Sequence, residues 1–309
     1  MEALPKVTVL SVFHNREDTA IESVRSLMNQ SYPNLEIIIV DDFSKDNTLK
    51  VIQELAASDI RLKVVANKPN KGFVASLIDV IKDLDSKYVA IHGAGDISLP
   101  ARIETQVKFL EANSDVGVVS VGVVNRSYDN VSNKPKQITL KDQLKRNNLN
   151  HGATMFRLSD YHKVGGYRSY FVQRQDKDLW YRMSLITKLY FLPDKLYQWV
   201  VQTSSVSADT GKNITQSLIS EFATFLIKER VVQGYDSIDK HGDRAALIFN
   251  PSTSNHIFYR DFRYNFIRMR FSLAYRHLDG LVKINTSWLT LGFLYCLKGI
   301  TRFFMLFSK

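Results

Sequence analysis

Two adjacent carboxylates, Asp41 and Asp42, directly follow a run of four β-branched residues, Ile37 to Val40. A continuous apolar run of this kind is typical of a strand that is buried on both faces of a parallel sheet. In an open α/β sheet, ligands bind outside the carboxyl ends of the strands. The position therefore predicts that Asp41 and Asp42 accept hydrogen bonds from a ligand. The structural alternative is that they cap the helix expected over residues 48–57.

Two more acidic residues stand at the ends of predicted elements. Asp96 closes the segment His92-Gly93-Ala94-Gly95-Asp96, which follows a predicted strand over Tyr88–Ile91. Asp176 lies in the first turn of a helix opened by Gln175, where the helix dipole favours a carboxylate. Each has a purely structural alternative: Asp96 caps a helix beginning at Pro100, and Asp176 caps its own helix.

Alternating strands and helices must position these acids. A buried strand over Val7–Phe13 precedes apolar residues at helical spacing between Ile21 and Met28. The strand before Asp41 comes next, then a helix and a third strand over Leu62–Val65. This β-α-β-α-β order predicts a mostly parallel sheet with right-handed crossovers. Later segments add a helix over about 73–84, strands over 116–124 and 189–192, and a loop with a short helix over 125–150.

Composition bounds the class of protein. The chain has 309 residues, 45% of them apolar, which predicts one large α/β domain or a domain with an extension. The single cysteine, Cys296, excludes an intramolecular disulfide and fits a reducing compartment. The first residues do not read as a signal peptide, and no stretch reaches the roughly 18 apolar residues of a spanning helix.

The positive charge is concentrated at the C-terminal end. Of the net charge of +10, residues 251–309 contribute +7, from nine Lys or Arg and two Asp or Glu. Aromatic and aliphatic residues are interleaved with these bases, which is typical of helices lying in the headgroup region of an anionic membrane. Packing on the rest of the protein is the alternative. Nucleic-acid binding rests on charge alone, and we expect no nucleic-acid partner.

The order of these motifs resembles the family 2 glycosyltransferases of the GT-A fold. The resemblance covers roughly residues 5–210. It rests on the opening strand with Asn15-Arg16-Glu17, and on the helix and turn from Ser26 to Glu36. It also rests on Val40-Asp41-Asp42-Phe43-Ser44-Lys45-Asp46-Asn47-Thr48, on Asn70-Lys71-Gly72, and on the segment from Asp96 to Ile103. The implied fold is an α/β, Rossmann-like GT-A domain over 1–215, with a nucleotide-binding half over 1–124 and an acceptor half over 125–215. A basic, amphipathic helical extension over 216–309 follows.

The resemblance implies a nucleoside-diphosphate sugar as donor. By that resemblance Asp41 or Asp42, with a slight preference for Asp42, binds the base or ribose. The backbone near Ser11 and Phe13 lines the base pocket, and Lys71 and Asp96 complete the donor-binding set.

The chain departs from the family at its usual metal site. Two to three acidic residues normally stand where this chain has Gly93-Ala94-Gly95-Asp96, and they help to hold a divalent cation against the diphosphate. Asp96 alone could still contribute to a Mn²⁺ or Mg²⁺ site with the diphosphate and water. Three interpretations remain open: weak metal use, metal-independent transfer in which His92 or a lysine balances the charge, and an inactive relative.

The resemblance assigns the catalytic base to Asp176, with Asp178 as the nearby alternative. A carboxylate must accept the proton of the acceptor hydroxyl as it attacks the anomeric carbon. His151 and Arg157 lie in a segment that often faces the acceptor in similar enzymes, and His162 and Tyr167 are equivalent candidates.

The expected function is therefore an inverting, hexosyl-type glycosyltransferase in surface polysaccharide, lipid-linked oligosaccharide or glycan synthesis. The alternative is a non-catalytic sugar-nucleotide-binding relative that has lost its acidic cluster. The basic segment over 260–309 predicts a cytoplasmic protein that is peripheral on the inner face of the membrane, with a glycan or lipid-linked acceptor.

Overall fold

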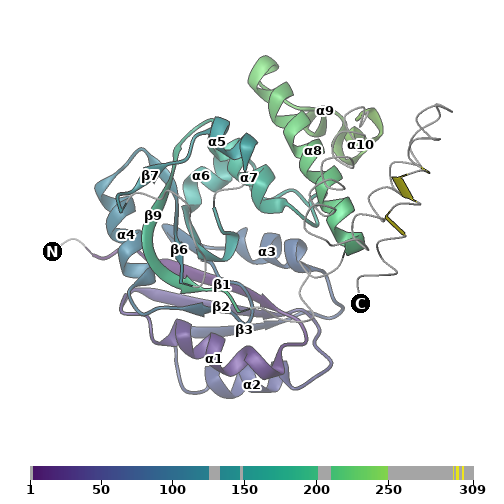
Figure 1. Ribbon diagram of the computed structural model, residues 1–309. Coiled ribbons are helices and arrows are strands. Elements are labelled where there is room, and N and C mark those ends of the chain that lie inside the picture. Colours follow the sequence, from purple (N-terminus) through teal and green to yellow (C-terminus); the bar gives the residue numbers. More distant parts are fainter. Residues whose placement is uncertain are drawn as a thin grey trace. The chain divides into compact units, whose positions relative to one another are not determined.

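A computed structural model describes residues 3–124, 133–146, 149–200 and 210–249, together with residues 295, 297–298 and 301–302 (Figure 1). The chain divides into two compact units, Met1–Val201 and Gln202–Lys309. The domain limits expected from the sequence, 1–215 and 216–309, stay a prediction. All acidic candidates for the site belong to the first unit.

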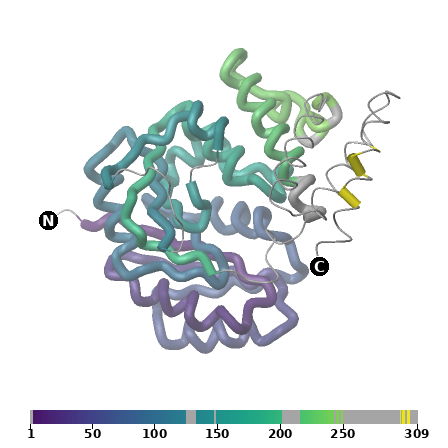
Figure 2. Tube along the Cα trace, in the orientation of Figure 1, coloured from purple at the N-terminus to yellow at the C-terminus, as the bar shows by residue number. Residues whose placement is uncertain are grey.

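A mixed sheet forms the centre of the first unit, in the order β3-β2-β1-β4-β8-β6-β9-β5, with β7 paired to β9. Its first half is parallel, as the alternating pattern predicts, and consists of β1 (Val7–Phe13), β2 (Leu35–Asp41), β3 (Leu62–Ala66) and β4 (Tyr88–Ile91). Figure 2 traces this β-α-β-α-β course from the N-terminus. Because these strands run in one direction, the loops after β1, β2, β3 and β4 meet at one edge of the sheet.

The second half of the sheet departs from the mostly parallel arrangement that we expected. β8 is antiparallel to both β4 and β6, whereas β6 and β9 are parallel. The strands of this half are β5 (Ile97–Ser98), β6 (Val116–Val123), β7 (Lys136–Gln137), β8 (Thr154–Arg157) and β9 (Lys188–Gln198). The two-residue strands β5 and β7 are too short to give a periodic signal. The prediction for β9 covered only residues 189–192, because the second half of this strand is largely polar and lacks an apolar run.

Helices cover both faces of the sheet and close one apolar core on each. On one face, apolar residues of β1 and β2 pack against α1 (Glu17–Met28), α2 (Thr48–Ala56) and α4 (Arg102–Ala112). On the other face they pack against α3 (Phe73–Ile81), α6 (Leu158–Lys163) and α7 (Gln175–Met183). Two short elements complete the unit, α5 (Leu140–Lys145) and the 3₁₀ turn His151–Ala153. Strand residues alternate between the cores: Val9 faces the first and Leu10 the second.

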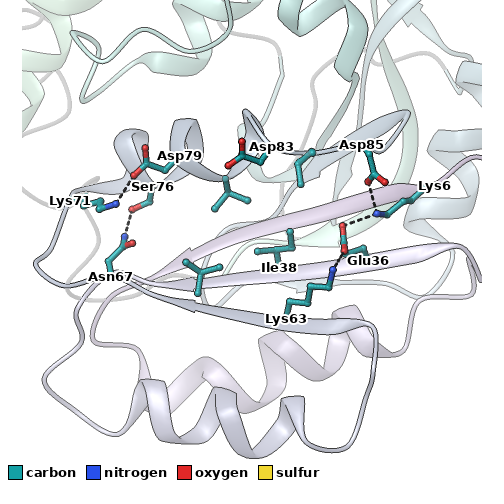
Figure 3. A pocket seen from close by; sticks show the side chains of 13 residues that line it. Lys6, Glu36, Ile38, Lys63, Asn67, Lys71, Ser76, Asp79, Asp83 and Asp85 are labelled. Carbon is teal, nitrogen blue, oxygen red and sulfur yellow. Dashed lines mark hydrogen bonds and ion pairs between the residues drawn. The ribbon is translucent and has the colours of Figure 1, made fainter.

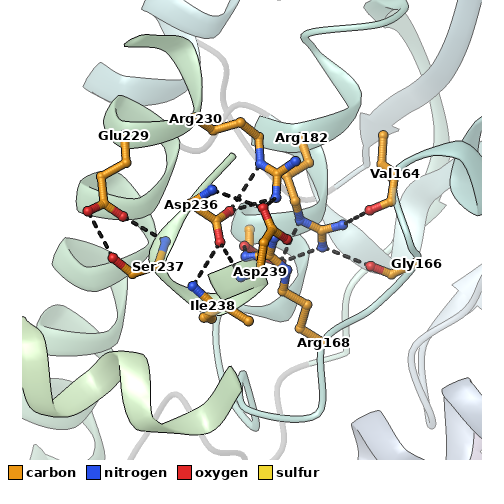
Figure 4. A network of polar contacts seen from close by, with 11 residues as sticks. Val164, Gly166, Arg168, Arg182, Glu229, Arg230, Asp236, Ser237, Ile238 and Asp239 are labelled. Carbon is orange, nitrogen blue, oxygen red and sulfur yellow. Dashed lines mark hydrogen bonds and ion pairs between the residues drawn. The ribbon is translucent and has the colours of Figure 1, made fainter. Parts of the chain in front are cut away.

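The first described element of the second unit is the long helix α8 (Thr210–Gln233). Arg230 near its end bonds the carboxylate of Asp236 at 2.9 Å, and Glu229 accepts a hydrogen bond from Ser237 Oγ at 2.9 Å (Figure 4). Asp236 in turn caps α9 (Ser237–His241), which is followed by a 3₁₀ turn, Gly242–Arg244, and α10 (Ala245–Ile248). None of the helices in the described part of the chain is long and apolar enough to cross a membrane. The basic segments over 262–281 and 287–307 lie outside the described residues, apart from five positions between 295 and 302.

Candidate active site

Hydrogen bonds join the loops that follow β1, β2 and β3. His14 Nδ1 lies 2.9 Å from the carbonyl oxygen of Asp42, and Asn70 Nδ2 donates to the same oxygen at 2.7 Å. The amide of Asn15 donates to Ser44 Oγ at 3.0 Å. These bonds fix the three loops at the edge where a parallel sheet binds its ligands.

Backbone strain gathers in the loops that carry the candidate residues. Among the described residues, three that are not glycine have a positive φ: Asn15 at 51°, Phe43 at 65° and Arg174 at 59°. The first two belong to the joined loops, and Arg174 immediately precedes Gln175 and Asp176. Left-handed backbone costs a side-chain-bearing residue on the order of 1–2 kcal/mol, and such strain clusters at binding sites.

Both carboxylate oxygens of Asp42 accept hydrogen bonds from other groups of the protein. Its Oδ1 accepts hydrogen bonds from Asn67 Nδ2 at 2.9 Å and from the Lys71 amide at 2.8 Å, with Ser76 Oγ at 3.4 Å. Its Oδ2 accepts from the Gly72 amide at 2.8 Å. The carboxylate thus holds the loop that leads into α3, and the expectation that it caps the helix after β2 is wrong.

Asp41 has the opposite character. It is buried, with 1% of its surface exposed, and its Oδ2 accepts a hydrogen bond from the Ser44 amide at 3.1 Å. Its Oδ1 has no hydrogen-bond partner, and neither does the hydroxyl of the buried Ser11 on the adjacent strand. Register places Phe13 beside Asp41 and Ser11 two residues earlier, so the two unpartnered groups lie on one face of β1 and β2. An unsatisfied buried polar group costs about 1–3 kcal/mol, which a ligand would relieve. Phe13 itself is fully buried in the core.

Lys71 contributes mainly through its backbone. Its amide bonds Asp42, whereas its ammonium group donates to Asp79 Oδ2 at 2.6 Å. Asp79 belongs to the lining of a cavity of about 550 Å³ between α3 and the face of β2 and β3 (Figure 3). Ion pairs flank this cavity, among them Lys6 with Asp85 and Lys63 with Glu36. Its lining contains neither Asp96 nor Asp176.

Asp96 is held by β9 and the residues after it. Its Oδ2 accepts a hydrogen bond from Tyr197 Oη at 2.5 Å, and its Oδ1 accepts from the Val200 amide at 3.0 Å. Burial raises the pKa of Asp96, against the lowering effect of these two hydrogen bonds. Asp96 therefore does not cap α4, whose N-cap is Ala101. The sequence gives no signal for Tyr197 in this role, because 101 residues separate it from Asp96.

His92 and Arg102 lie beneath the Asp96 loop, and both are fully buried. Burial lowers the pKa of His92 to about 3, so the ring is neutral and does not balance a diphosphate charge. Arg102 donates to Ser98 Oγ and to the carbonyl of Ile91, each at 2.8 Å, and burial lowers its pKa to about 10. Its guanidinium carbon lies 5.0 Å from the ring centroid of Tyr197.

The described residues do not fit a protein-held divalent cation. No group of three His, Cys, Asp or Glu among them is placed to hold a metal. Asp96 is the one acid left of the family's usual cluster. A hard cation takes several oxygen ligands, so this carboxylate alone makes a poor site.

Asp176 lies in the first turn of α7, near a buried aromatic cluster. His151 Nε2 lies 2.6 Å from Tyr167 Oη, and the ring of His151 contacts that of Trp180 with centroids 6.1 Å apart. Burial lowers the pKa of His151, and the charge of Asp176 acts on it in the opposite direction. His151 and Tyr167 are thus the members of the predicted acceptor-facing set that lie near Asp176.

The other acceptor-side candidates have structural partners. Asp178 is buried and pairs with Arg182, which also donates to the carbonyls of Val164 at 2.6 Å and Gly166 at 2.8 Å (Figure 4). Arg157 donates to the carbonyl of Val116 at 2.7 Å, and His162 is exposed on α6. Asp178 is therefore unsuited to be a base, because its charge is already engaged.

The family model for glycosyl transferase family 2 matches residues 8–179, more than half of the chain. The chain belongs to glycosyl transferase family 2. It is 37% identical to the putative glycosyltransferase EpsE of Bacillus subtilis over 191 residues, which are 59% of this chain and 68% of EpsE. An uncharacterized glycosyltransferase of Haemophilus influenzae is 40% identical, over 38% of this chain and 36% of its own length.

Solved glycosyltransferases share the fold. The mannosyltransferase PcManGT of Pyrobaculum calidifontis, in complex with GDP-Man and Mn²⁺, superimposes with a TM-score of 0.61 at 17% identity, over 98% of this chain and 86% of that one. TarS of S. aureus, in complex with UDP-GlcNAc, gives a TM-score of 0.58 at 14% identity, over 96% of this chain and 89% of that one. The protein is thus a glycosyltransferase with a GT-A fold, as its motifs predict.

Proposed function

We propose that this family 2 glycosyltransferase transfers a hexose, with inversion, from a nucleoside-diphosphate sugar to an acceptor hydroxyl. The observation that carries the donor assignment is the unpartnered Oδ1 of the buried Asp41 at the carboxyl end of β2. An N–H group of a nucleobase or a hydroxyl of a ribose could donate the hydrogen bond that this oxygen lacks. Two structural neighbours are complexes with sugar nucleotides, which supports the same class of donor here.

Within this proposal the roles of the predicted donor residues separate. Asp41 and Ser11 contact the nucleoside, while Asp42 and the backbone of Lys71 shape the loop beside it. Phe43 lies at the same edge in a left-handed conformation next to Asp42, with Lys45 Nζ 3.3 Å from the centroid of its ring. Asp96 faces the donor from the end of β4, where it accepts a hydrogen bond.

Asp176 acts as the general base in the proposed reaction. It accepts the proton of the acceptor hydroxyl while that oxygen bonds the anomeric carbon. The bond from that carbon to the diphosphate oxygen breaks on the opposite face, and the nucleoside diphosphate leaves with the electron pair. One in-line displacement inverts the anomeric configuration. His151 and Tyr167, whose side chains lie within hydrogen-bond distance of each other, are the proposed neighbours of the base.

The test combines a donor screen with one substitution. Thermal shift with UDP-, GDP-, ADP- and dTDP-sugars identifies the donor, because a ligand of the native state raises the melting temperature. With that donor, Asp176→Asn should lower transfer or donor hydrolysis by about 10²- to 10⁴-fold and leave the donor Kd within about twofold. The exposed Asp194→Asn on β9 serves as the matched control. Parental turnover by Asp176→Asn would refute the assignment of the base.

A second candidate function follows from Gly93 and Gly95, which stand where the family usually has acids. It is a sugar-nucleotide-binding protein without turnover. Donor binding by the parental protein, with neither transfer to any acceptor nor hydrolysis over a day, would favour this function. Product formation that Asp176→Asn abolishes would exclude it.

We further propose that the basic segment over 260–309 places the protein on the cytoplasmic face of an anionic membrane, with a glycan or lipid-linked acceptor in polysaccharide synthesis. Its net positive charge and interleaved aromatic residues support this. Replacing Arg263, Arg268 and Arg270 together by Gln should weaken binding to anionic vesicles by roughly 100-fold, at about 1 kcal/mol per base. Vesicle flotation measures it, with neutral lipid as control. Equal flotation of parent and variant would remove the support for a lipid-linked acceptor.

A further inference from the structure

The hydroxyl of Tyr197 contacts residues 93 and 96, in the loop where members of the family usually carry their metal-binding acids. It donates to Asp96 Oδ2 at 2.5 Å and accepts a hydrogen bond from the Gly93 amide at 3.0 Å. The side chain is fully buried and comes from β9, which pairs with β5 just beyond Asp96. One hydroxyl therefore fixes both the carboxylate and the backbone of the loop.

Two glycines make room for this hydroxyl. A Cβ added at Gly93 would collide with Asp96 Oδ2 and lie 3.1 Å from Tyr197 Oη. A Cβ added at Gly152 would collide with Tyr197 Oη and lie 3.0 Å from the ring carbon that bears it. An acidic side chain at position 93 is therefore incompatible with the Tyr197–Asp96 hydrogen bond. The hydrogen bond from Tyr197 to Asp96 therefore depends on glycine at position 93.

A fixed positive charge lies beneath the same ring. The guanidinium of Arg102 is fully buried, with its central carbon 5.0 Å from the ring centroid of Tyr197. Within the described part of the chain it donates to a hydroxyl, a side-chain amide oxygen and two backbone carbonyls rather than to a carboxylate. A cation against the ring face is attracted by the ring, so Arg102 helps to hold the ring of Tyr197 in place. Burial and the neighbouring Asp96 raise the pKa of Tyr197, against the lowering effect of Arg102, so the phenol keeps its proton and donates it to Asp96.

We propose that Tyr197 is a positioning residue. It holds Asp96 so that the carboxylate accepts a hydrogen bond from a hydroxyl of the sugar nucleotide, and the sugar nucleotide binds without a divalent cation held by the protein. This inference rests on the proposed donor site. Asp96 is partly exposed, so a remaining lone pair of its carboxylate is open to a ribose or sugar hydroxyl.

Calorimetric titration of the full chain tests the metal component, with UDP, GDP, ADP, CDP and dTDP as probes in EDTA and again in MnCl₂. We expect one of them to bind with dissociation constants that agree within about threefold between the two conditions. Titration with MnCl₂ alone, followed by electron paramagnetic resonance, should leave the signal of free Mn²⁺ unchanged. Binding that requires Mn²⁺ would overturn the inference and leave the proposed function intact. Failure of every nucleotide in both conditions would overturn the proposed function itself.

Tyr197→Phe tests the positioning role, because it keeps the ring over Arg102 and removes the hydroxyl. Loss of one charge-assisted hydrogen bond should raise the KM for the donor sugar nucleotide by about tenfold, equally in EDTA and in MnCl₂, with kcat nearly unchanged. Tyr190→Phe on the same strand is the control, since the ring of Tyr190 packs against Phe109. A Tyr197→Phe variant that melts like the parent and keeps its KM would refute the role.

Discussion

Asp41 and Asp42 are neighbours in sequence, yet the structure predicts opposite effects when each is changed to Asn. Asp42 accepts three hydrogen bonds from the loop that leads into α3 and a fourth from Ser76 in α3 itself. Asp41 is buried with one oxygen unpartnered. We therefore expect Asp42→Asn to lower stability, and Asp41→Asn to lower nucleotide affinity while stability is kept.

The magnitudes follow from the bonds that change. In Asp42→Asn, one carboxylate oxygen becomes an amide that faces an N–H donor. A hydrogen bond to a charged group contributes about 1.5–3 kcal/mol, and the remaining bonds weaken as the charge is lost. We expect a loss of about 3 kcal/mol, or roughly 6–12 °C in Tm for a unit of this size. In Asp41→Asn the Ser44 amide keeps an acceptor and a buried charge is removed. The free energy of unfolding should therefore stay within about 1 kcal/mol of the parent or rise.

The assay measures urea denaturation and nucleotide affinity for both variants at a temperature where both are folded. Asp41→Asn should bind the best nucleoside diphosphate about 10- to 150-fold more weakly, the equivalent of one charge-assisted hydrogen bond. The reasoning is refuted if Asp42→Asn unfolds like the parent, or if Asp41→Asn loses several kcal/mol of stability and keeps its affinity.

Three further predictions concern backbone strain, pH and packing. Phe43→Gly should change the free energy of unfolding by less than about 1 kcal/mol, because relief of left-handed strain offsets the entropy of glycine, and should weaken nucleotide binding by about 1–3 kcal/mol through the loss of stacking on the base. His92 has a pKa of about 3 when folded and about 6.5 when unfolded, so protons bind the unfolded state and stability falls as pH drops below 6.5. Chemical denaturation at pH 7 and pH 5 should show a loss of stability that is about 2 kcal/mol smaller in His92→Gln than in the parent and unchanged in the exposed His162→Gln, with the buried His151 contributing to the loss that remains; equal losses in all three proteins would contradict it. Gly152→Ala should cost about 1–3 kcal/mol by overpacking against Tyr197, and a parental Tm would contradict that geometry.

The parallel half of the sheet was predictable because each of its strands contains a short apolar run that is rich in β-branched residues. The predicted Tyr88–Ile91 strand coincides with β4, and the turns that follow these strands carry the nucleotide-site acids. The mixed half was not, since β8 joins β4 and β6 antiparallel through side-chain packing that a local pattern does not encode. The short helix α6 was missed because six residues give too little helical periodicity.

Sequence also left the two aspartates nearly equivalent, with a slight preference for Asp42 that the hydrogen bonds argue against. The side-chain alternation of a strand could have separated them, because consecutive residues point to opposite faces. Asp42 meets Asn67 and Ser76 on the side of α3, whereas Asp41 pairs in register with Phe13, whose ring packs in the core of the opposite face. The face on which α3 lies was the missing information.

The glycines at positions 93 and 95 show most clearly why residue types alone are ambiguous. In the sequence alone, glycine at these two positions indicates lost metal ligands and therefore an inactive relative. In the structure, Gly93 and Gly152, from segments far apart in the chain, both leave space for the single hydroxyl of Tyr197. That hydroxyl lies over a buried Arg102 and bonds the one remaining acid. A site that had merely lost its function would not require a side chain to be absent at two separate positions. The arrangement therefore favours a donor site rebuilt around Tyr197 and Asp96 over a site that has decayed.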